Sequence, residues 1–493
     1  MTEIPEVLVV GAGPTGLTAA MELSRLGVSV RIVDRAAQPS QTSRALGVQA
    51  RTLELLRVRG VGEDMLRLGN RATATALYAR GRRIAGLDFA RMTSDHNFIL
   101  LLAQSETERL LTEQLGRQGV KVDRGVEVIG LEQRPADVQV RLCTGDGAQE
   151  TVTAGYVIAA DGAHSPIRTT LGLPFEGRSL PHHYVLGDLH LAGEVPEDQL
   201  SIFLAPNGFL AVFPMGEGRF RFMATDPDGL TGESPEPDLA AIQALYDRVS
   251  PVPAELHDLN WSSRFRIHSR HMTSLRHGRV FFGGDAAHVH SPAGGQGMNA
   301  GIQDMINLAW KLAMVLDGRA REPLLDTYGS DRLPVIAQLV SMTERATAIF
   351  NSTSPLLHAT VTRLAPLLLA RPAVQDKAVP RLGQIAASYR GAPLAAGGGR
   401  AGALRAGDRV PDVEVGTAAG DRHRLYDLLD LTRLTLVTST DDAPAGYGDL
   451  IAVRQVSDGV DGWWLIRPDG YLAAAGPKGD QRVMTRWLSR WFS

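Results

Sequence analysis

Residues 7–34 read VLVVGAGPTGLTAAMELSRLGVSVRIVD, and this stretch decides the fold class. The short apolar run Val7–Val10 predicts a buried parallel strand, and Leu17–Leu26 predicts a helix that ends at Gly27. A second apolar run, Val28–Val33, predicts another buried strand. Strand, helix and strand in this order form a βαβ unit, so we expect an α/β fold built on a parallel sheet.

A glycine-rich turn joins the first strand to the helix. It fits the pattern G-x-G-x-x-G, and an aspartate follows at the end of the second strand. In a dinucleotide fold the first glycine allows the tight turn, the second lets the backbone approach a pyrophosphate, and the third lets the helix pack on the strand. The helix N-terminus attracts phosphates, and the carboxylate can accept hydrogen bonds from a ribose. The predicted dinucleotide-binding residues are Gly11, Ala12, Gly13, Pro14, Thr15, Gly16, Asp34 and Arg35.

A second glycine-rich stretch matches the same pattern by its letters alone. In Gly397–Gly402 the glycines have the required spacing, but no strand is predicted before them and no acidic residue follows at the right distance. The stretch lies in residues 391–402, which are rich in glycine and alanine and are typical of a linker. We therefore predict one dinucleotide fold.

Two further motifs follow predicted buried strands. Asp161-Gly162 comes after the apolar run Val152–Ala160, and Gly284-Asp285 comes after Arg279–Gly283. An aspartate at the carboxyl end of a parallel strand lies at the edge where open α/β sheets bind ligands. Taken singly, such a residue is more often a loop-capping aspartate. Together with the glycine turn, in this order, the two motifs indicate a nucleotide site.

The combined motifs resemble those of the class A FAD-dependent aromatic monooxygenases, which include the phenol and para-hydroxybenzoate hydroxylases and the aromatic polyketide hydroxylases. The resemblance covers the chain from Val7 to about Pro334. It implies that FAD fills the dinucleotide fold and that NADPH or NADH is a transient co-substrate. It also implies that O2 hydroxylates an aromatic, polycyclic polyketide-type substrate through a flavin C4a-hydroperoxide.

The resemblance implies FAD-binding roles for residues outside the glycine turn. Asp285 would bind the ribityl chain, and Asp161 would take part in binding FAD and the pyridine nucleotide. Arg44 would pair with the pyrophosphate, which suits the charge and the forked geometry of a guanidinium. Gln104 would lie near the flavin, and the backbone of Val126 would contact the adenine.

The loop Ser291–Asn299 is predicted to lie beside the reacting part of the cofactor. It joins Gly284-Asp285 to a predicted helix, Met298–Leu316, and backbone N–H groups at a helix N-terminus can stabilise negative charge. In the family this loop runs along the isoalloxazine ring. The implied flavin contacts are Pro292, Gly295, Gln296, Gly297, Met298 and Asn299. The candidate catalytic positions are Pro292, Gly295 and Gln296, and no side chain is identified as a firm acid or base.

A domain plan follows from these motifs and from changes in composition. The FAD-binding domain would resemble that of para-hydroxybenzoate hydroxylase, and a β-sheet domain with short strand-like runs would bind the substrate. The expected segments are 1–175 and 271–390 for the FAD-binding domain and its helices, 176–270 for the substrate domain, 391–402 for the linker and 403–493 for the C-terminal domain.

The C-terminal segment resembles the thioredoxin-like domain of the phenol hydroxylase branch, notably at Arg467–Tyr471. It lacks a CxxC motif and cannot perform dithiol chemistry, so a structural role or homodimer formation is expected. Because the FAD motifs all precede Arg400, truncation there is expected to leave FAD binding intact.

Composition excludes several other classes of protein. The formal net charge of -3 gives no field that would attract nucleic acid or an acidic membrane. No run of about 18 apolar residues is present, and the N-terminus lacks a secretory pattern, so we expect a cytoplasmic protein. The single cysteine, Cys143, excludes an intramolecular disulfide and a cysteine-rich metal site. His288 and His290 have no third ligand nearby in the sequence, so no metal is predicted.

Other functions remain open at this point. A flavin-dependent halogenase would resemble its relatives through a WxWxIP segment, which is absent: Trp261 is followed by Ser262-Ser263-Arg264. A Baeyer–Villiger monooxygenase acting on a polyketide and a simple phenol hydroxylase remain alternatives, whereas a non-catalytic FAD protein would not need the loop at 291–299. Histidines that could serve as a base have no decisive context, and we expect structural roles for His96, His183 and His190.

Overall fold

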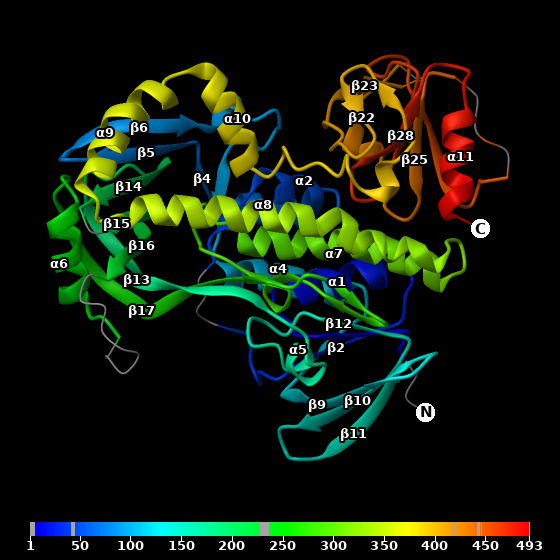
Figure 1. Cartoon of the computed structure of the whole chain (residues 1–493), viewed down its shortest axis with the longest axis horizontal. Coiled ribbons are helices and arrows are strands. Elements are labelled where there is room, and N and C mark those ends of the chain that lie inside the picture. Colours follow the sequence, from blue (N-terminus) through cyan, green and yellow to red (C-terminus); the bar gives the residue numbers. More distant parts are fainter. Residues whose placement is uncertain are drawn as a thin grey trace.

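The βαβ unit predicted from residues 7–34 lies in a six-stranded sheet of the computed structural model (Figure 1). β1 (Val7–Val10), α1 (Pro14–Arg25) and β2 (Val30–Asp34) confirm the predicted elements. The other strands are β8 (Val122–Arg124), β12 (Tyr156–Ala159), β18 (Arg276–His277) and β19 (Val280–Phe282). Their order is β18-β19-β12-β1-β2-β8, and only the β18–β19 pair is antiparallel. The structure describes residues 5–40, 45–206, 208–226, 236–417, 420–440, 444 and 446–492.

The prediction of one strand over Val152–Ala160 is wrong, because the run divides at Gly155. β11 (Gln149–Ala154) belongs to a separate antiparallel sheet with β10 (Val138–Thr144) and β9 (Val126–Gln133), whereas β12 begins at Tyr156 in the central sheet. The burial patterns differ: the first three residues of β11 are exposed, whereas every residue of β12 is buried. A continuous apolar run in the sequence does not reveal such a change of sheet.

A second, eight-stranded sheet lies on the left of Figure 1. Its strands are β5 (Ala74–Ala79), β6 (Arg82–Asp88), β13 (Glu176–Gly193), β14 (Gln199–Ala205), β15 (Gly208–Gly216), β16 (Arg219–Asp226), β17 (Ala254–His271) and β20 (His288–Val289). Their order is β20-β17-β13-β16-β15-β14-β5-β6. The expected strand-like runs of segment 176–270 form β14, β15 and β16. However, β5 pairs in parallel with β14, so the sheet also contains strands from residues 1–175, outside the segment expected for the substrate domain.

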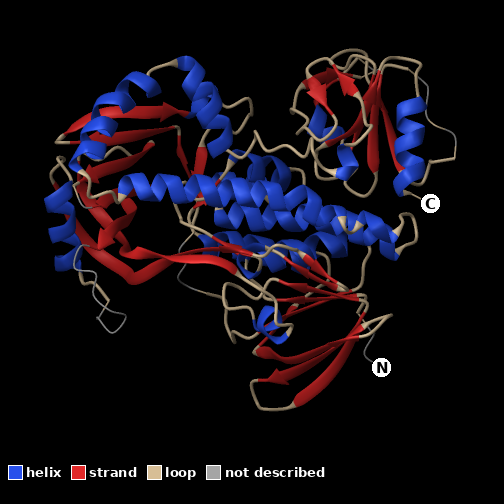
Figure 2. Ribbon diagram, viewed as in Figure 1, coloured by secondary structure: helices blue, strands red, loops and turns tan. Residues whose placement is uncertain are grey.

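Two long helices, α7 (Gly297–Leu316) and α8 (Thr327–Phe350), run side by side across the middle of the molecule (Figure 2). The remaining helices are α2 (Ala50–Arg57), α3 (Gly62–Leu68), α4 (Gln104–Arg117), α5 (Pro166–Thr170), α6 (Leu239–Val249), α9 (Pro355–Leu369), α10 (Pro372–Leu382) and α11 (Arg482–Trp491). A small sheet contains β3 (Gly47–Val48), β7 (Ile99–Leu101) and β4 (Asn70–Ala72). The helix predicted over Met298–Leu316 is confirmed as α7. It is buried on nearly all sides, so its polar residues need buried partners.

The C-terminal residues form a separate four-stranded sheet. Its strands are β25 (Leu434–Thr438), β26 (Ile451–Gln455), β27 (Trp463–Ile466) and β28 (Leu472–Gly476), in the order β26-β25-β27-β28. β25 and β26 are parallel, and the other two pairs are antiparallel. With α11 packed on this sheet, the arrangement is that of a thioredoxin-like domain (Figure 1).

The segment 391–402 is not a free linker. Gly399 pairs with Ala475 of β28, the Ala475 N–H donates to the Gly398 carbonyl at 2.7 Å, and a Cβ on Gly398 would overlap the Ala473 carbonyl oxygen. Trp487 of α11 donates its indole N–H to the Leu394 carbonyl at 2.6 Å. The glycines therefore allow the chain to pack tightly on β28, which the sequence does not distinguish from flexibility.

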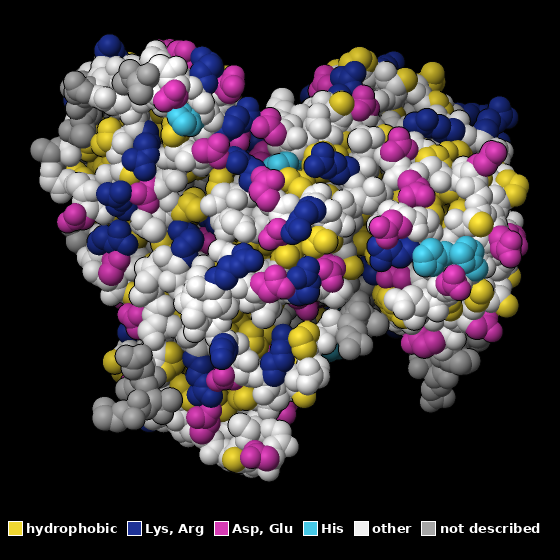
Figure 3. All heavy atoms as spheres, turned by 180° about the vertical axis from the view of Figure 1, so that it is seen from behind, with side chains coloured by type: hydrophobic (Ala, Val, Ile, Leu, Met, Phe, Trp, Pro, Cys, Tyr) yellow, Lys and Arg dark blue, Asp and Glu magenta, His cyan; other side chains and the backbone are white. Residues whose placement is uncertain are grey.

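None of the described helices combines the length and the apolar composition needed to cross a bilayer. On the face shown in Figure 3, acidic and basic side chains are interspersed.

Candidate functional site

The predicted motifs meet at one edge of the six-stranded sheet. β1, β12 and β19 are adjacent parallel strands, and each is followed by one motif: the glycine turn, Asp161-Gly162 and Gly284-Asp285. Asp34 ends β2, the neighbour of β1 on its other side. Because parallel strands end at the same edge, motifs far apart in the sequence are brought together where open α/β sheets bind ligands.

The glycine turn has the geometry expected of a phosphate-binding loop. Gly11 has a φ of +102°, and a Cβ there would overlap the Ala160 carbonyl oxygen. A Cβ on Gly16 would overlap the Gly11 carbonyl oxygen, so helix and strand can approach only because this side chain is missing. A Cβ on Gly13, at the N-cap of α1, would meet nothing within 4 Å. Open space therefore faces the N–H groups of α1, where a diphosphate can bind.

Asp34, at the end of the adjacent strand β2, stabilises this turn by hydrogen bonds. Its Oδ2 accepts from the Ala12 N–H at 2.5 Å, and its Oδ1 accepts from the Ala36 N–H at 2.8 Å. The Ala36 carbonyl accepts from the Gly125 N–H at 3.2 Å, which places Val126 beside the end of β2. Arg35 is exposed. The residues predicted for the adenosine half of the cofactor therefore lie together.

Asp161 is partly buried in the loop that follows β12. Its Oδ2 accepts from the Ile167 N–H at 3.2 Å, whereas its buried Oδ1 has no hydrogen-bond partner among the described residues. Burial raises the pKa of this carboxyl above its usual value. Arg168 donates to the carbonyls of Ala163 (2.8 Å) and Ala286 (2.7 Å), so it ties the Asp161 loop to the Asp285 loop. The sequence gives no signal for this role of Arg168, because its partners are backbone carbonyls.

The Gly284-Asp285 motif packs directly on the glycine turn. A Cβ on Gly284 or on Gly301 of α7 would overlap the Thr15 hydroxyl, so Thr15 is held between these two glycines. Asp285 itself is exposed in a short 3-10 helix, Gly284–Ala286. This exposure leaves the carboxylate accessible to a ligand at the sheet edge.

Asp304 of α7 is the buried acceptor that holds this motif in place. Its Oδ2 accepts from the Gly284 N–H at 3.1 Å and contacts His288 Nε2 at 2.8 Å, and its Oδ1 accepts from Arg332 of α8 at 2.7 Å. Although burial alone would raise the pKa of Asp304, the guanidinium of Arg332 and the adjacent imidazole lower it. His288 is thus engaged structurally. Asp304 and Arg332 were missed because their partners are distant in the sequence.

The loop 291–299 makes a tight turn before α7. The Gly295 N–H donates to the Pro292 carbonyl at 2.9 Å, and Gly294 and Gly295 have φ values of +82° and +62°. A Cβ on Gly294 would lie 2.9 Å from Leu382 Cδ1. Two consecutive residues with positive φ explain why glycine is needed here.

The side chains of Gln296 and Asn299 hold this loop rather than face open space. Asn299 is fully buried and donates to the carbonyls of Gly47 and Gly295, both at 2.8 Å. Gln296 donates to the carbonyls of Gly294 and Leu382, both at 2.9 Å, and is also fully buried. Only the backbone of these two residues can therefore face a cofactor, while Gly297 and Met298 are partly exposed.

Gln49 is a second residue that holds the loop 291–299 in place. Its N–H donates to Asn299 Oδ1 at 2.8 Å, and its Nε2 donates to the Gly294 carbonyl at 2.7 Å. Gln49 follows β3, so the 45–49 segment is fixed against the loop 291–299. A glutamine outside any recognisable motif gives no sequence signal for this role.

Gln104 begins α4 beside the same segment. Its N–H donates to the Ala45 carbonyl at 3.3 Å, and its Nε2 donates to Glu108 at 2.7 Å. Arg221 of β16 also donates to the Ala45 carbonyl at 3.1 Å and forms an ion pair with Asp188 at 2.7 Å. Arg44, which was predicted to pair with the pyrophosphate, lies outside the described residues.

The candidate bases do not gather at this site. His96 lies in the segment that connects β6 to β7. It is buried, and this burial lowers its pKa. His183 lies within β13 opposite Asp226 and Arg266, and His190 lies further along the same strand. His290 is next to the loop 291–299, and burial lowers its pKa to about 4.

The arrangement fits FAD. The open space at Gly13, the N-terminus of α1, the unpaired buried oxygen of Asp161 and the exposed Asp285 all lie at one sheet edge. These are donors and acceptors for a diphosphate and for polyol hydroxyls.

Comparison with known proteins agrees with this geometry. The FAD binding domain family matches residues 5–343, and the aromatic-ring hydroxylase C-terminal family matches residues 404–493. The chain is 35% identical to 6-methylpretetramide 4-monooxygenase of Streptomyces rimosus, over 98% of this chain and 93% of that protein. It is 32% identical to pentachlorophenol 4-monooxygenase of Sphingobium chlorophenolicum, over 94% and 86% of the two chains. The solved structure of an anhydrotetracycline hydroxylase from Streptomyces rimosus superposes with a TM-score of 0.81 at 30% identity, covering 99% of each chain.

Fold, site and comparisons together define a flavoprotein that uses FAD to oxygenate aromatic compounds. The chain belongs to the family of FAD-dependent aromatic-ring monooxygenases, of the branch that carries the C-terminal aromatic-ring hydroxylase domain. FAD is its cofactor, and NAD(P)H is the reductant used by this class.

Proposed function

We propose that this enzyme hydroxylates a polycyclic aromatic substrate of the polyketide type, with NADPH or NADH as reductant and O2 as oxygen donor. The observation that carries the proposal is an apolar cluster beside the loop 291–299. Most of its members are buried, whereas Phe213, Met215 and Leu382 at its edge are only partly buried. The buried members include Leu46, Ala50, Met92, Ile99, Leu101, Leu200 and Ile385.

The position of this cluster suits a flat apolar ligand. Leu382 lies against Gly294, so the cluster continues directly from the loop proposed to hold the flavin. Phe213 and Met215 of β15 are only partly buried, unlike Phe203, Phe209, Phe222 and Met223, which belong to the cores of the sheet. Apolar side chains that stay accessible next to a cofactor loop provide the surface against which an aromatic ring can pack.

The protein's own contribution is to bind, orient and exclude water. When bound, FAD supplies hydride acceptance and oxygen activation. The turn at Gly13 and the N-terminus of α1 would hold its diphosphate, and Asp34 would support the turn from β2. The backbone of the loop 291–299 would face the ring system, with Pro292 nearest the reacting region, while Asn299 and Gln49 keep this loop in its conformation.

The named substrates of relatives support the polyketide assignment but leave a simple phenol as the alternative. One relative acts on 6-methylpretetramide, and an aligned structure is an anhydrotetracycline hydroxylase. Another relative acts on pentachlorophenol. All three align over nearly the whole chain, so length does not discriminate between the two substrate classes.

The test is a comparison of substrates on one FAD-loaded preparation. NADPH and NADH oxidation should be measured with a tetracyclic naphthacene, an angucycline-type aromatic and simple phenols, with product mass and hydrogen peroxide measured in parallel. The proposal predicts a coupled gain of one oxygen atom as a ring hydroxyl, with a higher kcat/KM for the polycyclic compounds. Preferred, coupled turnover of a monocyclic phenol would support the phenol hydroxylase alternative instead. Ring expansion would support Baeyer–Villiger oxygenation.

A further inference from the structure

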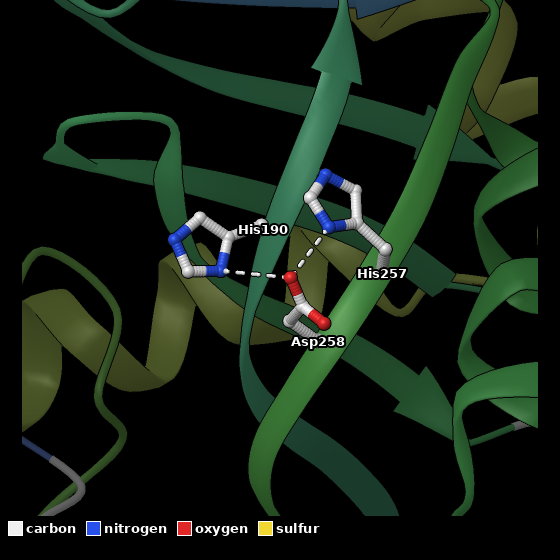
Figure 4. Close-up of side chains that lie close together, drawn as sticks. All are labelled: His190, His257 and Asp258. Atoms are coloured by element: carbon white, nitrogen blue, oxygen red, sulfur yellow. Dashed lines mark hydrogen bonds and ion pairs between the residues drawn. The ribbon is translucent and has the colours of Figure 1, made fainter.

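We propose that His190, His257 and Asp258 form a binding site for a divalent transition-metal ion of the zinc class. Figure 4 shows the three side chains turned toward one another, with His190 on β13 and the other two on β17. One ligand atom from each residue lies within 4.8 Å of the other two. The residues are brought together by strand pairing, so their positions in the sequence do not reveal the cluster.

A bulge in the β13–β17 pair creates the cluster. Asp188 pairs with Trp261 and His190 pairs with His257, so Asp258, Leu259 and Asn260 stand opposite a single residue of β13. The φ of Asp258 is +49°, in the left-handed region that few residues except glycine, asparagine and aspartate adopt readily. The bulge turns the Asp258 side chain back between the two imidazoles. Bulges commonly redirect a side chain in this way.

The donor atoms are arranged as metal ligands would be. His257 Nδ1 lies 2.9 Å from Asp258 Oδ2, and His190 Nδ1 lies 4.0 Å from the same oxygen. Zinc ligands at their usual bond lengths in a tetrahedron stand about 3.3 Å apart. The two distances bracket this value, so small side-chain rotations would bring all three atoms to one ion.

One of these atoms has no hydrogen-bond partner in the part of the chain that the structure describes. His190 Nδ1 is buried, and no described residue hydrogen-bonds to it. The imidazoles of His190 and His257 are stacked, with centroids 5.5 Å apart and planes inclined by 17°. A buried nitrogen without a partner is unfavourable, and a metal bond would satisfy it.

The chemistry of the donor set indicates which ion would bind. Two imidazoles and one carboxylate are typical zinc ligands, and the exposed Asp258 leaves room for water in the fourth position. Among divalent ions, Cu2+ would bind such nitrogen-rich sites more tightly than Zn2+, and the hard ions Mg2+ and Ca2+ would bind weakly. The ion would link β13 to β17 across the bulge.

This site is remote from the FAD site. The Gly284-Asp285 motif leads into β20, which pairs with Arg270 and His271 of β17, while His257 is near the other end of that strand. At about 3.3 Å per residue, the two regions are separated by on the order of 40 Å along β17. Metal binding can therefore be measured without confusion with cofactor binding, and the proposal does not depend on the proposed function.

The test is calorimetric titration of the full-length, FAD-loaded enzyme with zinc chloride after removal of any histidine tag. We expect one Zn2+ per chain and a rise in Tm that saturates with the same stoichiometry. His190→Ala and His257→Ala should weaken binding by at least roughly 10–100-fold, which is the loss typical when only an outer-shell partner of a metal ligand is removed. Asp258→Asn keeps the side-chain shape and should also weaken binding, because an amide oxygen is a poorer ligand than a carboxylate.

His423→Ala is the matched control, because His423 is an exposed histidine of the C-terminal domain. It should bind zinc as the wild type does, and FAD content should be the same in all variants. The absence of stoichiometric binding by the wild type would overturn the proposal. So would unchanged affinity in all three site variants while they retain FAD, because the bound zinc would then lie elsewhere.

Discussion

At the residue scale, Gly13 and Gly16 stand three positions apart in one turn and are needed for different reasons. A side chain at Gly13 would enter open space beside the N-terminus of α1, whereas one at Gly16 would overlap the Gly11 carbonyl oxygen. The first glycine therefore leaves room for a ligand, and the second allows the protein to pack. This difference can be separated experimentally because one substitution acts on binding and the other on folding.

We predict that Gly13→Ala retains the stability of the FAD-free protein but weakens FAD binding about tenfold, equivalent to ~1.4 kcal/mol. Gly16→Ala should lower the free energy of unfolding of the FAD-free protein by about 1–3 kcal/mol through overpacking. FAD fluorescence titration and urea unfolding measure the two effects. Wild-type FAD affinity in Gly13→Ala would show that the diphosphate does not lie against this turn.

His290, beside the loop 291–299, makes the stability of the folded protein depend on pH. Burial holds its folded-state pKa at about 4, below the ordinary value of 6.5, and its Nδ1 donates to the Ser291 carbonyl at 2.8 Å. Between these two values the unfolded chain takes up a proton that the folded protein does not, so stability falls as the pH drops from 6.5 to 4.

We predict that His290→Asn, whose amide can replace the Nδ1–H donor, loses less stability on acidification than the wild type. The difference between pH 7 and pH 5 should be on the order of 1–2 kcal/mol, since one pKa unit corresponds to about 1.4 kcal/mol. Urea unfolding at the two pH values provides the measurement. Parallel acid dependence in both proteins would mean that His290 does not contribute.

The backbone of the glycine turn has the geometry that its sequence predicts. The glycine turn was recognisable because tight turns and close approaches require glycine at fixed spacing. Gln49, Arg168 and Asp304 escaped prediction because their roles arise from partners in other elements, and a buried hydrogen bond leaves no local pattern.

At the element scale, the loop 291–299 is a short turn fixed at both ends. Gln49 and Asn299 link it to the 45–49 segment, and Gln296 links it to the end of α10. The two glycines at its centre keep backbone conformations that β-branched residues rarely adopt. We infer that the conformation of the turn, rather than any side chain on it, determines how the flavin ring is held.

Gly295→Val should therefore slow hydride transfer to FAD and release hydrogen peroxide in place of hydroxylated product. The expected reduction in coupled turnover is roughly tenfold, about 1.4 kcal/mol in the activation free energy. Stopped-flow anaerobic reduction, followed by product and peroxide analysis in air, measures both effects after FAD content is equalised.

Gly119→Val is the control, because Gly119 also has a positive φ, +86°, and a Cβ there would meet nothing within 4 Å. It imposes the same backbone strain at the end of α4, away from the loop. If both variants reduce and hydroxylate as the wild type does, the loop neither contacts the flavin nor limits its movement.

Helices and strands marked by clear runs or repeats of apolar residues were predicted correctly. The points at which one element ends and another begins were not. β1, α1, β2 and α7 follow from runs of apolar residues with clear ends. The division at Gly155 and the packing of 391–402 on β28 could not be predicted, because glycine is equally compatible with a bend, a close contact and a flexible segment.

At the scale of the whole molecule, buried charges join the C-terminal domain to the FAD-binding domain. Arg467 pairs with Asp331 of α8 at 2.8 Å, and Asp331 also pairs with Lys311 of α7 at 2.8 Å. Burial, opposed by the carboxylate of Asp331, lowers the pKa of Lys311 to about 8. Arg51 of α2 donates to the Asp469 carbonyl at 2.6 Å. The helices that support both cofactor loops are thus partnered by the C-terminal domain.

These contacts change the expectation that truncation before Arg400 leaves FAD binding intact. Removal of the domain would take Arg467 away from buried Asp331, and it would take the Tyr426 hydroxyl and the Asp469 carbonyl away from buried Arg51. We predict that the truncated chain is destabilised and retains little FAD, and that Arg467→Met costs about 3–5 kcal/mol, as is typical when one partner of a buried ion pair is lost. Thermal unfolding and the flavin absorbance after gel filtration are the measurements. A stable, yellow truncated protein would contradict this view of the interface.

Isotope labelling tests whether the FAD-loaded enzyme inserts one atom of O2 into an aromatic ring. The FAD-loaded enzyme should be supplied with NADPH or NADH and its preferred polycyclic aromatic under 18O2. We predict one 18O atom per product, located by mass and NMR in a hydroxyl on a ring carbon. Label located within an expanded ring, or product oxygen derived from water, would show that the enzyme does not hydroxylate the ring with O2.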